Sequence, residues 1–177
     1  MGETMVDFRE NITEQLQAYA PYIRGNPLAS LIAVKGSPGL AELAGDPPFS
    51  GADGLALDKA FGRLGWGFGS HDTRIWFGIV LSRPNHPRLS AQELRLICEI
   101  VDPHVIAALD DIARLALIEA FCPVEKSLQA DFVSGGEYRV LGRHLVSIEG
   151  FEASLADEAS KQKAWAQLKR CVFPSLR

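Results

Sequence analysis

The sequence predicts an α/β protein, a three-layer α/β/α sandwich in which helices cover both faces of a central, mostly parallel sheet of about four strands. Short apolar runs, typical of strands buried on both faces, alternate along the chain with longer segments whose apolar residues recur at helical spacing. The 177 residues and the 47% hydrophobic content suffice for one substantial core. We therefore expect a single domain over residues 1–177.

The first half of the chain predicts a helix, a strand, a second helix and a second strand. An amphipathic helix is expected within residues 8–22, with Asp7 as its N-cap and an end before Pro21. A buried strand over about 28–34 and a helix over about 53–64 should follow. The apolar and aromatic segment 74–81 predicts the second buried strand.

The second half continues the alternation. Ser90 and Glu93 form a capping-box pattern for a helix that ends at about residue 101. A strand over about 104–109 follows, and Asp110 then caps a helix over 111–121. The segments 138–141 and 145–148 predict either a final hairpin or a short strand plus a core strand. The last helix is expected over about 155–171.

The loop after the first strand is the first candidate for a binding site. Gly36 and Gly39 can adopt backbone angles denied to other residues, and Pro38 fixes its own φ, so residues 35–39 should turn sharply. Ligands of open α/β sheets bind at this carboxyl end of the strands. Gly78, inside the second strand, would allow another backbone or a ligand to approach closely.

Composition and charge limit the partners. The formal net charge of −4 argues against a broad cationic surface, so a nucleic-acid contact must rely on a local cluster and be sensitive to salt. No apolar run is long enough to span a bilayer and the first residues are too polar for a signal peptide, so we expect no membrane contact and a cytoplasmic location. The three cysteines lack CxxC spacing, which predicts reduced thiols.

A set of collinear motifs resembles the iron–sulfur type of uracil-DNA glycosylase. The first motif region of that family matches Pro38-Gly39 and the stretch 48–59 with the same spacing. Four further segments resemble later parts of the family: 80–84, 90–94, 102–109 and 161–169. Together the matches cover about residues 28–170. The resemblance implies a uracil-DNA-glycosylase-like fold.

The resemblance also implies a chemistry and a partner. Such enzymes flip a damaged nucleotide out of DNA, stack its base on an aromatic ring and hydrolyse the bond between base and sugar. DNA, single-stranded or with a flipped base, would be the partner. The stacking ring maps to Phe49, with a core phenylalanine as the alternative. Lys35 and the loop Gly36, Ser37, Pro38 and Gly39 would contact the nucleotide, with a simple tight turn as the alternative, and Glu42 is the candidate for positioning water, with a solvated loop residue as the alternative.

Several positions depart from the family. Gly78 stands where the family reads the base with an Asn, and Gly150-Phe151-Glu152 stands where it carries His-Pro-Ser. The cluster cysteines have no counterpart, so we expect no iron–sulfur cluster, no other cofactor and no metal site. His144 would replace the missing histidine only in a shifted alignment. Uracil excision should therefore be weak or lost.

The loop after the second strand carries three further candidates. In a related branch of the superfamily a histidine in this loop bonds to the deoxyribose, which makes His86 a candidate catalytic residue. Arg83 and Arg88 beside it could contact phosphate. The alternative is a proline-rich solvent loop.

Three hypotheses about function follow. The first is a DNA-binding or nucleobase-binding protein with divergent or lost glycosylase activity. The second is a non-enzymatic scaffold that binds other proteins. The third is an α/β domain that binds a phosphorylated small molecule through its Gly/Pro loop. A cationic rim would favour the first and an exposed apolar patch the second; the sequence leaves the oligomeric state open.

Overall fold

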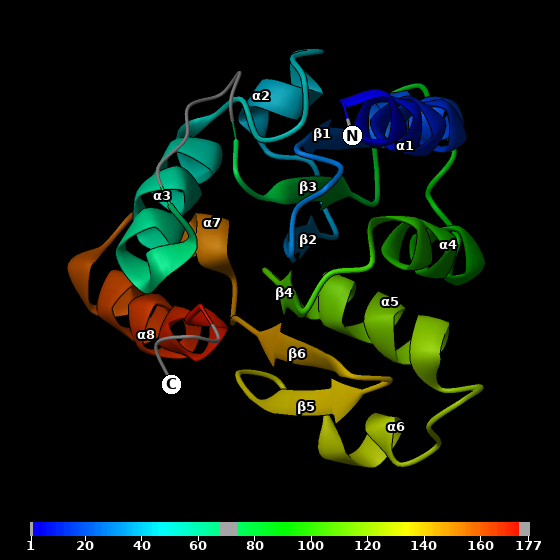
Figure 1. Ribbon diagram of the computed structural model, residues 1–177. Coiled ribbons are helices and arrows are strands. Elements are labelled where there is room, and N and C mark those ends of the chain that lie inside the picture. The colour runs from blue at the N-terminus through cyan, green and yellow to red at the C-terminus, as the bar shows by residue number, and fades with distance from the viewer. Residues whose placement is uncertain (1, 68–73, 174–177) are drawn as a thin grey trace.

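The centre of the fold is a mixed β-sheet. A computed structural model describes residues 2–67 and 74–173, and within them six strands form one sheet in the order β1-β3-β2-β4-β6-β5 (Figure 1). The strands are β1 (Ile23–Gly25), β2 (Leu31–Lys35), β3 (Phe77–Val80), β4 (Val105–Ala108), β5 (Glu137–Val140) and β6 (Arg143–Ser147).

The parallel part of the sheet is the part that the sequence predicts. β3, β2, β4 and β6 run parallel, whereas β1 pairs antiparallel with β3 and β5 pairs antiparallel with β6. The prediction of about four strands is therefore too low, because it leaves out the two antiparallel strands at the edges of the sheet. β1 has three half-buried or exposed residues, too few for a periodic signal. The two readings of the last hairpin are both correct, since β6 pairs with β5 and also with β4.

Helices cover both faces of the sheet. The α-helices are α1 (Gly2–Leu16), α2 (Leu40–Leu43), α3 (Ala52–Phe61), α4 (Ala91–Val101), α5 (Asp111–Phe121), α6 (Leu128–Asp131), α7 (Phe151–Ser154) and α8 (Glu158–Leu168). Short 3-10 helices follow α1 and α8, namely η1 (Gln17–Tyr22) and η3 (Lys169–Cys171), and a π-helix, η2 (Gly62–Trp66), follows α3. Figure 1 shows α1, α4 and α5 on one side of the sheet and α3, α7 and α8 on the other.

Alternation along the strands divides the core into two clusters. Ile32 and Val34 point to the face that α1, α4 and α5 cover, and Leu31 and Ala33 point to the face that α3 and α8 cover. All four side chains are fully buried. Successive residues of a strand point to opposite faces, which places Lys35, the last residue of β2, on the α3 side.

The helices with strong local signals agree best with the sequence. Ser90 accepts a hydrogen bond from the N–H of Glu93 at the start of α4, and Asp110 accepts one from Ala113 at the start of α5. α1 departs from the prediction: it begins at Gly2, not after Asp7, and Pro21 lies inside η1. α2, α6 and α7 were missed because each has only one turn, and the expected last helix begins later, at Glu158, and consists of α8 and η3.

The connections leave a crevice at the carboxyl edge of the sheet. The connection from β2 to β3 runs over the α3 face, and the one from β4 to β6 runs over the α5 face. The chain therefore leaves the neighbouring strands β2 and β4 in opposite directions, which is the topological switch point where α/β proteins bind ligands. No helix in the described part of the chain has the length and apolar character needed to cross a membrane.

Candidate functional site

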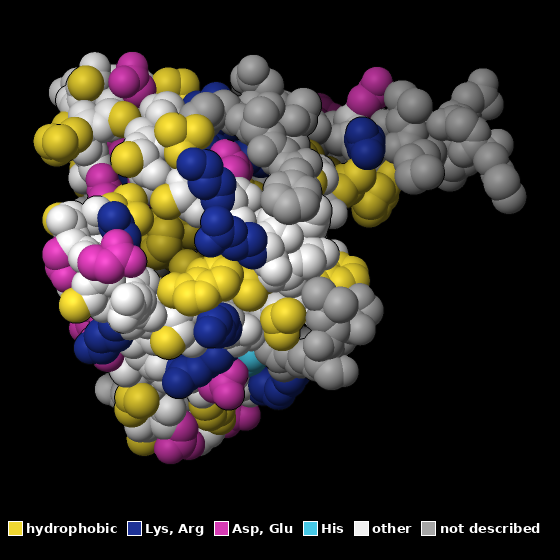
Figure 2. All heavy atoms as spheres, turned by 90° about the vertical axis from the view of Figure 1, so that its left-hand side faces the viewer, with side chains coloured by type: hydrophobic (Ala, Val, Ile, Leu, Met, Phe, Trp, Pro, Cys, Tyr) yellow, Lys and Arg dark blue, Asp and Glu magenta, His cyan; other side chains and the backbone are white. Residues whose placement is uncertain are grey.

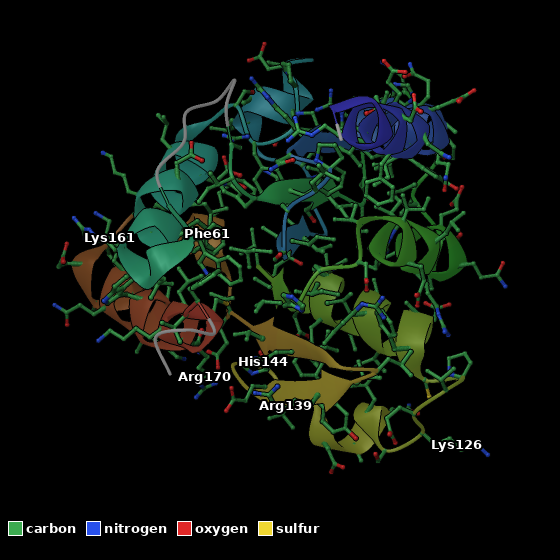
Figure 3. All side chains as sticks on the ribbon, viewed as in Figure 1. Phe61, Lys126, Arg139, His144, Lys161 and Arg170 are labelled. Carbon is green, nitrogen blue, oxygen red and sulfur yellow. The ribbon has the colours of Figure 1, made fainter. Side chains whose placement is uncertain are left out.

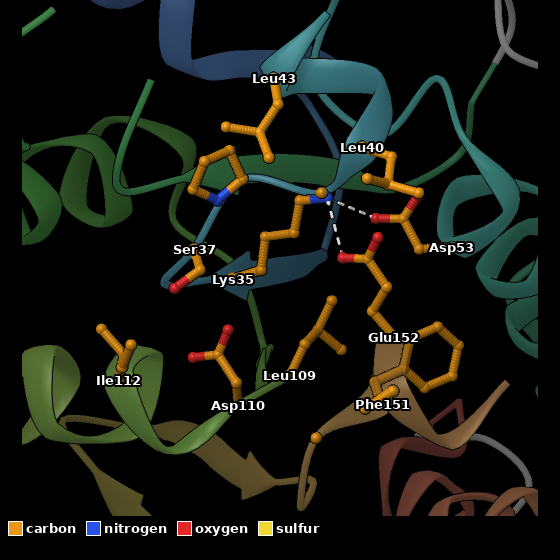
Figure 4. A pocket seen from close by; sticks show the side chains of 14 residues that line it. Lys35, Ser37, Leu40, Leu43, Asp53, Leu109, Asp110, Ile112, Phe151 and Glu152 are labelled. Carbon is orange, nitrogen blue, oxygen red and sulfur yellow. Dashed lines mark hydrogen bonds and ion pairs between the residues drawn. The ribbon is translucent and has the colours of Figure 1, made fainter. Parts of the chain in front are cut away.

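A pocket of about 470 Å³ opens at this switch point (Figure 4). Its walls come from the loop after β2, from α2, from the start of α5 and from α7. The residues that line it are Lys35, Ser37, Pro38, Gly39, Leu40, Leu43, Asp53, Leu109, Asp110, Ile112, Gly150, Phe151, Glu152 and Ala153. The volume lies in the range of small-molecule sites, about 300–1,000 Å³.

Lys35 forms the floor of the pocket and carries its ammonium group into a cluster of carboxylates. The side chain is only 3% exposed. Its Nζ lies 2.5 Å from Asp53 Oδ2, 2.7 Å from Glu42 Oε1 and 3.7 Å from Glu152 Oε2. Two carboxylates thus neutralise the buried ammonium directly, and the third faces it across the pocket.

These contacts change the pKa of both Lys35 and Glu42. Burial by itself would lower the pKa of Lys35, but the hydrogen bonds and negative charges of Asp53 and Glu42 outweigh burial and raise it. Burial would likewise raise the pKa of Glu42, but the bond from Lys35 and the backbone N–H of Phe49 lower it. Both groups are therefore charged near neutral pH.

Glu42 makes the contacts of a structural carboxylate. It is 1% exposed, and its two oxygens accept hydrogen bonds from the N–H groups of Gly39 (2.8 Å) and Phe49 (2.7 Å) besides pairing with Lys35. These bonds join α2, the loop after β2 and the segment before α3. A catalytic role for Glu42 stays a prediction, and the alternative of a solvated loop residue is wrong, because the side chain is buried.

Glu152 is the carboxylate that remains partly open to the pocket. It lies on α7, its side chain is 45% exposed, and it contacts Lys35. Burial, together with the negative charges of Asp53 and Glu42, raises its pKa, although Lys35 acts in the opposite direction. Its carboxylate form is thus disfavoured by the groups around it.

The glycines of the loop are explained by close approach and not by unusual backbone angles. Gly39 has φ −82°, which any residue adopts, but a side chain there would collide with Glu152. The N–H of Gly36 donates to Asp110 Oδ2 at 2.8 Å, and that of Gly39 donates to Glu42. The expectation of special φ values is therefore wrong, and these two N–H groups are already bonded within the protein.

Phe49 lies beside the pocket and not in its lining. The side chain is fully buried, with the Lys35 ammonium 4.8 Å from its ring centre and Trp76 packed edge-on at 5.2 Å. Gly78 lies beneath the ring, where an added Cβ would come within 2.6 Å of Phe49. The close approach predicted at Gly78 is thus made by this ring. Stacking of Phe49 on a base stays a prediction, and it would require Lys35 or Trp76 to move.

A second polar cluster, which the sequence did not predict, fixes the backbone of Phe49. This residue has φ 56°, in the left-handed region that costs a non-glycine residue about 1–2 kcal/mol. Arg74 Nη2 donates to the carbonyl of Phe49, and Arg74 also pairs with Asp58. Asp58 in turn accepts a bond from Trp76 Nε1 at 2.7 Å.

The candidates in the loop after β3 lie outside the pocket. Arg83 donates to the carbonyl of Asp46 at 2.7 Å, so the loop does contact the segment between α2 and α3. His86 packs edge-on against Tyr22, with 5.9 Å between the ring centres, and both His86 and Arg88 are exposed. None of the three lines the pocket, so the structure does not bring them together with Lys35 and Glu152.

His144 also lies away from the pocket. It is buried near the start of β6, where its Nε2 lies 2.7 Å from Glu137 of β5, and Figure 3 shows it on the hairpin with Arg139. In the sheet it stands level with Val105 and Leu31, whereas Lys35 is four residues further along β2. At about 3.3 Å per residue, His144 is roughly 13 Å from the pocket level along the strands.

Several exposed cations lie on the face formed by α3 and α8. Figure 2 shows Lys and Arg side chains above and below a hydrophobic centre on the side formed by α3 and α8. Exposed members of this face are Lys59 and Arg63 from α3 and η2, and Lys163 and Lys169 from the α8 end.

Sequence reasoning missed Asp53 and Asp110 as pocket residues, and gave Glu152 no role. A usable signal exists for the last two, because each follows closely on the end of a predicted strand, at the edge where ligands bind. Asp53 gives no such signal, since it begins α3 far from β2 in sequence. Among the described residues, no group of three or more His, Cys, Asp or Glu side chains is arranged to hold a metal ion.

The fold and the pocket define an α/β protein with a ligand-sized site at the carboxyl edge of a mixed sheet. Comparison of the chain with protein-family models and with curated proteins gave no match. The function is therefore argued from the site itself.

Proposed function

We propose that this chain is a divergent uracil-DNA-glycosylase-like protein that binds a nucleobase or nucleoside in the pocket above Lys35 and has lost uracil excision. One observation carries the proposal. Two segments that align with functional motifs of that family are more than a hundred residues apart in the sequence, yet both line the same pocket: Pro38-Gly39, which matches its motif, and 150–152, which stand where the family carries His-Pro-Ser. The resemblance assigns both sets of positions to one ligand site, and their meeting at one pocket supports the proposal.

The walls of the pocket suit a flat, mostly apolar ligand. Leu40, Leu43, Leu109, Ile112 and Phe151 supply apolar surface around the polar floor. Sites of this composition bind heterocycles by burying their faces and fixing their edges with a few polar groups. Glu152 and Ser37 stand at the pocket wall as such groups.

The same geometry argues against excision of uracil. Hydrolysis needs a carboxylate with a free acceptor for water and an aromatic ring that the base can reach. Glu42 is engaged by three donors, and Phe49 is covered by Lys35 and Trp76. The proposal is therefore binding, with DNA as one source of the base.

The test is a binding panel measured by calorimetry, with nucleobases, nucleosides and single-stranded oligonucleotides that carry modified bases. Ala153 lines the pocket and is exposed, so Ala153→Trp should fill the entrance and abolish binding. Ala166→Trp, on an exposed position of α8, is the matched control and should bind as the wild type does. Absence of binding across the panel, or equal binding by Ala153→Trp, would refute the proposal. A uracil-containing oligonucleotide should stay intact.

The scaffold is the second candidate, and the rim of the pocket favours it. Leu40 is 85% exposed, Leu43 57% and Ile112 40%, and neighbouring apolar side chains of this size at a pocket mouth are a feature of protein-binding surfaces. On a peptide array, this candidate predicts that wild-type protein retains peptides with apolar anchors and that Leu40→Ser/Leu43→Ser loses them. Nucleosides would then bind neither protein.

A further inference from the structure

We infer that the pocket selects a positively charged ligand, of the class of cationic N-methylated nucleobases, over neutral bases and over phosphate-bearing ones. This inference rests on the proposed function, because it assigns the charge of the ligand that the proposed pocket would take. The observation behind it is the excess of negative charge in and beneath the pocket, which the apolar walls do not screen.

Carboxylates outnumber cations at this site. Among the described residues, Glu42, Asp53, Asp110 and Glu152 face or line the pocket against the one ammonium of Lys35, a formal net charge of −3. Glu42 and Asp53 hold that ammonium at 2.7 and 2.5 Å. The floor therefore has no cation left to attract an anionic group.

Asp110 and Glu152 differ in how free their oxygens are to accept a hydrogen bond from a ligand. Asp110 accepts bonds from the N–H groups of Gly36 and Ala113, which fixes it as a helix cap. Glu152 lies 3.7 Å from Lys35 and is 45% exposed, so it combines a pocket position with open acceptor capacity and does not cap a helix through such bonds. Figure 4 shows it reaching from α7 toward Lys35 and Asp53 at the centre of the site.

A cationic ligand would relieve the repulsion that Glu152 experiences. Glu152 faces Lys35 from β2, Glu42 from α2 and Asp53 from α3, and the two carboxylates help burial to raise its pKa. A positive ring beside it would favour the ionised form. Ionisation of Glu152 and binding of the cation would therefore favour each other, and affinity for the cation would rise with pH through the titration of Glu152.

A phosphate would meet the opposite situation. It would add negative charge to an anionic, largely apolar cavity in which electrostatic interactions are stronger than in water. The one-turn helix α2 offers no compensation, because Glu42 already accepts the N–H of Gly39 at its start. The Gly/Pro loop is thus unsuited to the phosphorylated small molecule that the sequence left as an alternative.

The test uses ligands of equal size that differ in charge. 1-Methyladenosine is cationic at neutral pH and N6-methyladenosine is its neutral isomer; adenosine 5′-monophosphate adds a phosphate. By calorimetry at pH 7, the cation should bind at least about tenfold more tightly than its isomer, and the nucleotide least of all. Equal affinities of the two isomers would overturn the inference while leaving the proposed function in place; no nucleoside binding would refute the function itself.

Two variants and one further ligand complete the test. Glu152→Gln should bring the affinity ratio of the isomers close to one, whereas Glu158→Gln, an exposed position on α8, should leave it unchanged. Persistence of the full ratio in Glu152→Gln would contradict the assignment. N-acetyl-lysine amide carries a cation without a ring, and binding as tight as that of 1-methyladenosine would overturn the nucleobase class.

Discussion

The two halves of the sheet's carboxyl edge are built from similar elements but are filled differently. Over β2 and β3, the Phe49 ring lies on the sheet at Gly78 and packs against Trp76, the residue before β3, and both aromatic side chains are fully buried. Over β2, β4 and β6, a pocket of about 470 Å³ stays open. Lys35 lies on the boundary, beside the Phe49 ring on one side and facing Glu152 on the other.

Local sequence and chain direction explain this difference. Gly78 has no side chain, so the Phe49 ring descends onto the sheet and closes its half. At the other half, α5 and α7 begin directly after β4 and β6 and belong to opposite faces. Because α5 and α7 lead away to opposite faces of the sheet, their side chains do not fill the space between them. The open pocket therefore lies at the same edge as the Phe49 ring that the motif resemblance singles out, but apart from it.

Loss of the Lys35 ammonium should have the largest effect, because it serves both halves. Lys35→Met leaves Glu42 and Asp53 buried without a cation and should lower the free energy of unfolding by about 3–5 kcal/mol. Urea unfolding measures this. The double variant Lys35→Met/Glu42→Gln should recover part of the loss. A loss below about 1 kcal/mol for Lys35→Met would show that water reaches the carboxylates of this cluster and that Lys35 does not hold the two halves together.

Phe49→Ala tests whether the filled half is core. Removing a fully buried phenylalanine should cost about 3–5 kcal/mol, and φ 56° does not change this, because alanine has about the same cost in the left-handed region. Thermal and urea unfolding report the loss, with Phe8→Ala on the exposed face of α1 as the control. A stability close to wild type, joined to loss of base binding, would instead identify Phe49 as an open stacking ring.

Gly78→Ala should have an intermediate effect confined to the same half. The added methyl would lie 2.6 Å from one carbon of the Phe49 ring and about as close to the next ring carbon. The ring must therefore shift, at a cost of about 1–3 kcal/mol. Near-ultraviolet circular dichroism of Trp76, packed against Phe49, should change as well. Ligand affinity of the pocket should stay within a factor of about three, and a large loss of affinity would mean that the two halves are coupled.

Glu152→Gln should have the smallest effect on stability, because the open half contributes little packing. The folded-state pKa of Glu152 is raised above its unfolded value, so its ionisation opposes folding as pH rises through that range. The variant should therefore match or slightly exceed wild-type stability at pH 7, within about 0.5 kcal/mol. Its stability should also fall less than that of wild type as pH rises above the ordinary glutamate range. A marked loss at pH 7 would assign Glu152 to the structural cluster.

The sequence determined those parts of the molecule whose signals are local. Ser90 with Glu93 predicts the start of α4, and Asp110 predicts the start of α5, because a cap bonds to a backbone group three residues away. The parallel core strands are readable because strands buried on both faces must be apolar throughout. These features follow from interactions within one short segment.

Tertiary structure alone decided which polar groups meet. Lys35, Asp53 and Glu152 come from β2, α3 and α7. Lys35 and Glu152 each lie near the end of a predicted strand, but nothing in the sequence around Asp53 indicates that it joins them. The same holds for Phe49, whose role depends on whether Trp76 and Lys35 cover it. The charge and the open volume of a site depend on distances between segments far apart in the chain, and those distances exist only once the sheet has brought the ends of its strands together.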